Sequence, residues 1–131
     1  MKNTDYGMHR KLPGTGFDEA VDRVTEALKQ EGFGVLTSID VRATLQAKIG
    51  VGFRPYVILG ACNPFLAHRA LSEDDNIGLL LPCNVVVAAT DDGSEVAIAY
   101  PQSMMALAGN PALREVADEA QARLDRVLAA L

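Results

Sequence analysis

Two stretches of the chain repeat apolar residues at the spacing of an amphipathic helix, with charged residues on the opposite face. The first begins at Phe17, next to a capping signal formed by Thr15 and Asp18, and Gly32 is suited to the position just beyond its end. The second begins at Asn110-Pro111, where an N-cap asparagine precedes a proline at the first helical position. We therefore predict a long helix near each end of the chain.

Shorter apolar runs that are rich in β-forming residues lie between these helices and predict strands. The Asp-Gly pair within residues 91–94 is typical of a hairpin turn, so the runs on its two sides should pair antiparallel. Pro82 interrupts the preceding run, which is either one broken strand or two strands in series. The predicted strands cover residues 9–12, 33–39, 56–59, 78–81, 84–90 and 95–100.

Two shorter helices are predicted from their capping residues. Asp40 is placed to cap a helix over residues 41–48, which Gly50 ends. Asn63-Pro64 repeats the cap-plus-proline start and predicts a helix over residues 65–71 that leads into a polar loop.

The predicted order of elements is β-α-β-α-β-α-β-β-α. A length of 131 residues suits one domain, so we predict a single domain over residues 1–131. A late hairpin together with long helices at both ends favours an α+β fold, with helices packed on one face of a largely antiparallel sheet.

Charge and hydropathy exclude some classes of function. The net charge of −5 and the lack of any run of Lys or Arg argue against a nucleic-acid partner, because phosphate binding needs a basic surface. The longest apolar run is far shorter than the ~20 residues of a membrane span, so we expect no membrane association. The amino-terminal residues do not resemble a signal peptide. We therefore expect a cytoplasmic protein with reduced cysteines.

Both cysteines of the chain lie in short phrases of similar composition, residues 60–64 and residues 80–85. In each phrase the cysteine is followed by asparagine, and each phrase contains one proline. Cys62 directly precedes the predicted N-cap Asn63, and the free N–H groups of a helix start favour a thiolate. Cys83 lies at the break in the apolar run, where the backbone should leave regular pairing. We expect any chemistry of this protein to lie near these two sulfur atoms.

Three interpretations of the cysteines remain open. They are small buried apolar residues, or soft ligands for a metal ion such as zinc, copper(I) or iron, or a redox pair. A closed zinc site needs four ligands, so two thiols would need help from His9, His68, Met104, Met105 or a second subunit. A redox pair needs the two Cα atoms within about 7 Å of each other.

Three motifs carry a family resemblance: DVxxTLxxKIG at residues 40–50, RPYxILGACNP at 54–64 and IGxLLPCNV at 77–85. Together they resemble the widespread prokaryotic family known as domain of unknown function three hundred and two. The resemblance implies a compact α+β domain of the TATA-box-binding-protein-like β-α-β(4)-α type, and a homodimer. It implies no activity. The positions that match the family pattern are Asp40, Lys48, Cys62, Asn63, Pro64, Pro82, Cys83 and Asn84.

The leading hypothesis is a cytoplasmic homodimer that binds a small molecule or a soft metal ion. The predicted site residues are Cys62, Asn63, Cys83 and Asn84, with Asp40 and Lys48 as polar or charged contacts near them. The sequence leaves open whether the protein is an enzyme. The enzyme alternative is a thiol-dependent redox or transfer reaction with Cys62 as nucleophile and Cys83 as resolving thiol. A third alternative is a structural or interaction module in which both phrases only shape the core or a dimer contact.

Overall fold

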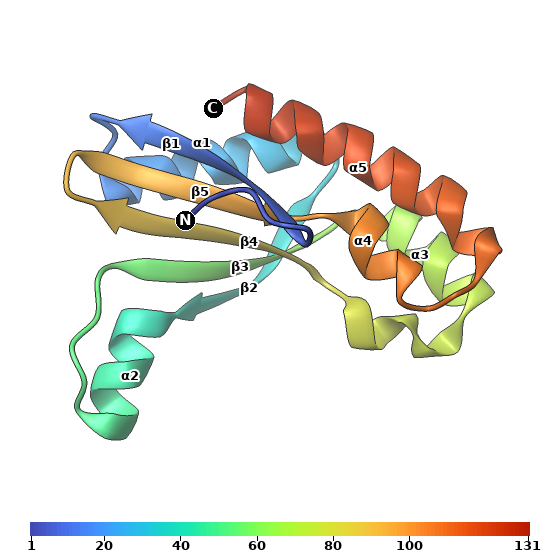
Figure 1. The fold of residues 1–131 in the computed structure, drawn as a ribbon, viewed down its shortest axis with the longest axis horizontal. Coiled ribbons are helices and arrows are strands. Elements are labelled where there is room, and N and C mark those ends of the chain that lie inside the picture. The colour runs from blue at the N-terminus through green and yellow to red at the C-terminus, as the bar shows by residue number, and fades with distance from the viewer.

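Five strands form one antiparallel sheet in the order β1-β5-β4-β3-β2 in the computed structural model, which describes residues 1–131 (Figure 1). Each neighbouring pair of strands is antiparallel, as the hairpin and the short connections predict. The strands are β1 (Gly7–Pro13), β2 (Gly34–Asp40), β3 (Tyr56–Cys62), β4 (Cys83–Thr90) and β5 (Gly93–Ala99).

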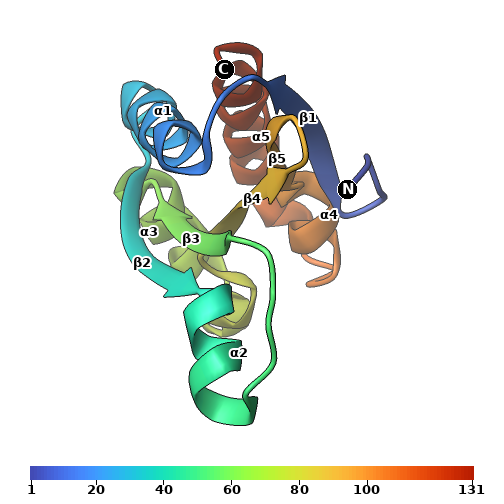
Figure 2. The ribbon, with the colours of Figure 1, turned by 90° about the vertical axis from the view of Figure 1, so that its left-hand side faces the viewer.

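Two long helices cover one face of this sheet, and three shorter ones lie at its ends (Figures 1 and 2). The helices are α1 (Phe17–Gln30), α2 (Val41–Ile49), α3 (Pro64–Glu73), α4 (Pro101–Ala106) and α5 (Arg114–Ala129), with 3-10 turns at Asp75–Leu80 and Pro111–Leu113. None of them is long and apolar enough to cross a membrane.

The core lies between the sheet and the helices α1 and α5. Val24 and Leu28 of α1 and Leu124 of α5 are fully buried. They pack over alternate residues of the central strands, including Val87 and Ile98. Of the 25 buried apolar residues, 24 form one cluster, so the chain forms a single α+β domain, as predicted.

Several local predictions are confirmed. Asp40 caps α2 and accepts a hydrogen bond from the Ala43 amide, and Gly50 follows that helix in the left-handed conformation. Asn63-Pro64 begins α3. The cap predicted at Thr15 is wrong, because Gly16 occupies the N-cap position of α1.

Two predicted strands are present with different bounds, and the strand predicted at 78–81 is wrong. The strand predicted at 56–59 continues to Cys62, because Gly60 and Ala61 pair with both β2 and β4. Residue 60 is a glycine inside this strand, and the Thr37 side chain occupies the space where a Cβ would lie. Residues 78–81 form no strand, because most of them belong to the 3-10 turn Asp75–Leu80. Asp74 caps this turn, which buries Ile77 in the core. The strand predicted at 95–100 is β5, which ends at Ala99, and Pro101 begins the helix α4, which the sequence analysis did not predict.

One face of the sheet is left without a helical layer. A row of residues crosses it in register, one per strand: Ile39, Ile58, Val86, Ala97 and His9. On the same side, α2 projects away from the body of the domain (Figure 2). No residue of α2 is buried, so this helix contributes nothing to the core.

Candidate functional site

The register between β3 and β4 brings the two cysteine phrases side by side. Ala61 pairs with Cys83 and Gly60 pairs with Asn84, which places Cys62 next to the start of β4. Both cysteines are free thiols. The strand pairing thus joins two phrases that lie 21 positions apart in the sequence.

Both cysteines line one small cavity at the end of the sheet. Its volume is about 30 Å³, and 11 of its 13 lining residues are apolar. The walls come from β3 and β4 and from the helices α3, α4 and α5. Pockets that bind organic ligands usually measure about 300–1,000 Å³. The cavity therefore has room for a single ion or a water molecule, and not for an organic ligand.

Asn63 lines the cavity, and its side chain caps α3. Its Oδ1 accepts hydrogen bonds from the amides of Phe65 at 3.1 Å and Leu66 at 3.2 Å. Its Nδ2 packs against Gly32, where an added Cβ would lie 2.9 Å away. The first cysteine phrase thus includes a structural residue that holds the start of α3 against the end of α1.

The electrostatics of the thiols differ from the expectation that Cys62 is a stabilised thiolate. Burial raises the pKa of Cys62 above its usual value. Burial, and then the neighbouring Cys62 thiol, raise the pKa of Cys83 to about 11. Asn63 accepts hydrogen bonds from the Phe65 and Leu66 amides at the start of α3, so these donors are not free to stabilise a thiolate against burial. Both thiols are therefore protonated at neutral pH when no cation is bound.

The other predicted site residues lie outside this cavity. Asn84 is exposed on β4. Asp40 and Lys48 are exposed at the two ends of α2, and neither lines the cavity. His68 is exposed on α3. Of the predicted site residues, the fold brings together Cys62, Asn63 and Cys83.

The structure contains no group of three or more His, Cys, Asp or Glu side chains that could hold a metal ion. Of the residues considered as further ligands, Met105 lines the cavity with the two thiols. Met104 does not line it, and His9 is bound to Glu95 instead. The Asn63 side-chain oxygen already accepts two amide hydrogen bonds, so the potential side-chain ligands left in the cavity are sulfur atoms.

A second polar cluster surrounds Glu95 on β5, which sequence reasoning missed. The carboxylate is 4% exposed and contacts His9 Nε2 at 2.8 Å, Arg54 Nη1 at 2.8 Å and the Met1 amino group at 3.0 Å. Burial alone would raise the pKa of Glu95, but the hydrogen bonds from Arg54, the amino terminus and His9 lower it to about 2. The alternation of apolar and polar residues along β5 predicts that Glu95 faces solvent. Its three partners come from distant segments, which no local pattern in the sequence indicates.

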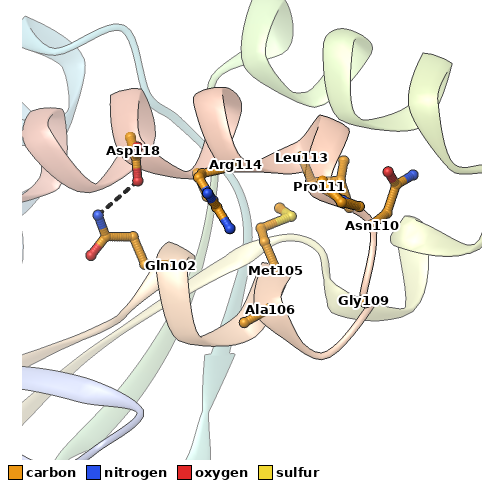
Figure 3. A pocket seen from close by; sticks show the side chains of 10 residues that line it. Gln102, Met105, Ala106, Gly109, Asn110, Pro111, Leu113, Arg114 and Asp118 are labelled. Atoms are coloured by element: carbon orange, nitrogen blue, oxygen red, sulfur yellow. Dashed lines mark hydrogen bonds between the residues drawn. The ribbon is translucent and has the colours of Figure 1, made fainter.

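A larger groove lies between α4 and α5 (Figure 3). It measures about 420 Å³, and the Gln102 amide donates a hydrogen bond across it to Asp118 at 2.9 Å. Arg114 and Asn110 lie farther along the same groove. Met105 lines both the groove and the thiol cavity, so this one side chain belongs to the wall between them.

Comparison with known proteins identifies the family. The family model described as "Domain of unknown function DUF302" matches residues 8–131. The crystal structure of the uncharacterized conserved protein DUF302 from Bacillus stearothermophilus is similar, with a TM-score of 0.86 and 37% sequence identity. The match covers 95% of this chain and 96% of that one. No curated protein matches the chain.

Proposed function

The chain belongs to the DUF302 family, and we propose that it binds a soft metal ion through the thiols of Cys62 and Cys83. The observation that carries this proposal is that both thiols line one cavity of about 30 Å³. An ion fits this volume, whereas the small-molecule ligand of the sequence-based hypothesis does not. Thiolates are the ligands that soft ions such as copper(I) and zinc prefer.

The raised pKa values favour metal binding over nucleophilic chemistry. A nucleophilic cysteine needs a thiolate near neutral pH, and burial raises the pKa of both thiols here. A bound cation changes this balance, because it displaces the protons and neutralises the thiolates in the apolar cavity. Metal affinity should therefore rise with pH. We place this activity in the cytoplasm, where reducing conditions keep both thiols available.

Native mass spectrometry with elemental analysis tests the proposal. The protein should be purified without reductant and without metal-affinity resin. We expect the wild-type chain to carry one copper or zinc ion and both Cys62→Ser and Cys83→Ser to lose it. Asn84→Ala is the matched control, since it alters the second phrase without touching the cavity, and it should keep the ion. Retention of the ion by both folded serine variants would contradict the proposal, and a mass deficit of two protons would favour the redox alternative.

We also propose that two copies of the chain associate through α2 and the uncovered face of the sheet. Ile49, Val51 and Phe53 are exposed apolar residues at the end of α2 and just after it, and Leu36 and Ile39 are exposed on β2. Such a cluster is typical of an interaction surface. Since α2 and the uncovered face lie on the same side of the domain, a two-fold axis can set each α2 against the sheet of the other copy (Figure 2).

Charge supports a second copy as the occupant of this surface. Residues 40–55 carry Arg42, Lys48 and Arg54 against one acidic residue, Asp40, which gives this segment a net charge of +2. The whole chain carries −5, so the remainder carries −7. The opposite net charges of this segment and of the remainder favour the encounter of two copies.

Analytical ultracentrifugation tests this association. Wild-type protein should sediment at twice the mass of one chain, and Ile49→Glu should sediment as a monomer. Leu107→Glu is the control, because Leu107 is a similarly exposed apolar residue at the end of α4, far from α2 (Figure 1). A wild-type monomer, or a dimer that Ile49→Glu leaves intact, would show that this surface does not join two copies.

The order of elements supports a TATA-box-binding-protein-like fold. With the connecting helices α2 and α3 set aside, the chain runs β1, α1, four strands and then α4 and α5. We do not extend this proposal to DNA binding, because a fold does not assign a function. The net charge of −5 opposes binding to phosphate.

A further inference from the structure

The side chain of Met105 is the third sulfur group of the thiol cavity. Met105 lies on α4, is 6% exposed and lines the cavity together with Cys62 and Cys83. No histidine, aspartate or glutamate lines this cavity. The side chains that could ligate an ion through sulfur are thus two thiols and one thioether, which come from β3, β4 and α4.

This set of ligands distinguishes between the soft metals. Zinc in structural sites is almost always bound by four cysteine, histidine or carboxylate ligands, and thioethers are not among them. Copper(I) accepts fewer ligands and prefers thiolate and thioether sulfur. We propose that the cavity is a copper(I) site in which the Met105 thioether joins the thiolates of Cys62 and Cys83. This inference rests on the proposed function and adds the identity of the ion and the third ligand.

Met105 forms part of the wall between the cavity and a larger groove, so we place at this side chain the entry path that a buried metal site requires. The same side chain lines the groove between α4 and α5, where Gln102, Asn110 and Asp118 offer polar atoms (Figure 3). A copper(I) ion in the groove would meet the thioether before the thiols, because the cysteines line the cavity and not the groove. Methionine does not need to lose a proton to bind the ion, so it can do so while both thiols are still protonated.

Two variants separate a metal ligand from a residue that only fills space. Met105→Leu nearly preserves the volume of the side chain and removes the sulfur. Met104→Leu is the matched control, because Met104 precedes Met105 on the same helix and lines neither the cavity nor the groove. If Met105 only fills space, Met105→Leu should change the stability of the protein and leave its copper(I) affinity unaltered.

The first experiment is an anaerobic titration of the reduced full-length protein with copper(I) against a chromogenic copper(I) chelator. Loss of a residue that only supports a metal ligand lowers metal affinity ~10–100-fold. Met105 is proposed as a ligand itself, so we expect Met105→Leu to weaken copper(I) binding by at least this factor. Met104→Leu should bind as wild type does, and zinc should compete poorly with copper(I) in the wild-type protein. Copper(I) binding that Met105→Leu leaves unchanged, while Cys62→Ser abolishes it, would overturn this inference and leave the proposed function intact. Wild-type protein without any copper(I) or zinc binding would overturn both.

A second measurement avoids dependence on the folding of the leucine variant. The wild-type protein is labelled with selenomethionine, loaded with copper(I), and its X-ray absorption fine structure is recorded at the copper edge. We expect a selenium neighbour of copper, which is absent from selenomethionine-labelled Met105→Leu and present in labelled Met104→Leu. A copper site with sulfur neighbours and no selenium neighbour in the wild-type protein would exclude Met105 as a ligand.

Discussion

The Nη1 atom of Arg54 donates a hydrogen bond to Oε2 of Glu95 at 2.8 Å and another to the carbonyl oxygen of Ala89 at 3.0 Å. Arg54 lies in the segment between α2 and β3, and Glu95 lies on β5. The guanidinium group thus ties the segment that follows α2 to two strands beyond β3. His9 of β1 also contacts Glu95. One carboxylate therefore connects the edge strand β1 with the segment that precedes β3.

The Glu95 cluster should make stability depend on pH. Its folded-state pKa of about 2 lies below the ordinary value of 4.5, so its stabilising contribution is present above pH 4.5 and is lost as the pH falls through 2. Glu95→Gln should cost about 1.5–3 kcal/mol at pH 7, the usual value of hydrogen bonds to a charged group. Urea unfolding should show this difference shrinking toward zero near pH 2. Glu115→Gln, with an 88% exposed side chain, should cost less than about 1 kcal/mol.

Cys83 should alkylate slowly in the folded protein. Burial, helped by the Cys62 thiol, raises its pKa to about 11, so little thiolate exists near neutral pH. Iodoacetamide labelling followed by peptide mass spectrometry should give a rate that keeps rising up to about pH 11. In urea the rate should instead level off above a pH of about 8.5, which is the ordinary pKa of a cysteine thiol. Labelling of Cys83 at neutral pH as fast as in the unfolded chain would contradict the buried site.

Asn63 and Asn84 should respond differently to the same substitution, although each follows a cysteine. Asn63→Ala removes the cap of α3 and should cost about 0.5–2 kcal/mol in the free energy of unfolding. Asn84→Ala changes an exposed side chain and should stay within about 0.5 kcal/mol of wild type. Chemical unfolding of both variants measures the difference, and equal costs would show that the cap is not the role of Asn63.

Gly60 should not tolerate a side chain. A Cβ at this position would overlap the hydroxyl of Thr37 and lie 2.8 Å from Cγ of Pro82. Gly60→Ala should therefore destabilise the protein by about 1–3 kcal/mol, the usual cost of overpacking. Gly34→Ala is the control on the neighbouring strand, because nothing lies within 4 Å of its added Cβ. A melting temperature for Gly60→Ala equal to that of Gly34→Ala would show that the sheet relaxes around residue 60.

The sequence by itself determined the features that depend on neighbouring residues. The caps at Asp40 and Asn63, the glycine after α2 and the amphipathic spacing of α1 act within a few positions of the chain, because hydrogen bonds of a helix end are local. The turn between β4 and β5 is local in the same sense. These signals sufficed to predict an α+β domain with a largely antiparallel sheet.

Only the tertiary structure decided which side chains meet. The pairing of β3 with β4 brings Cys62 and Cys83 to one cavity, and the docking of the unpredicted helix α4 adds Met105. The helix start that predicted a thiolate at Cys62 is occupied by Asn63, so burial sets the direction of the pKa instead. Pairing register and helix docking are set by packing over the whole core, and no local pattern of residues encodes them.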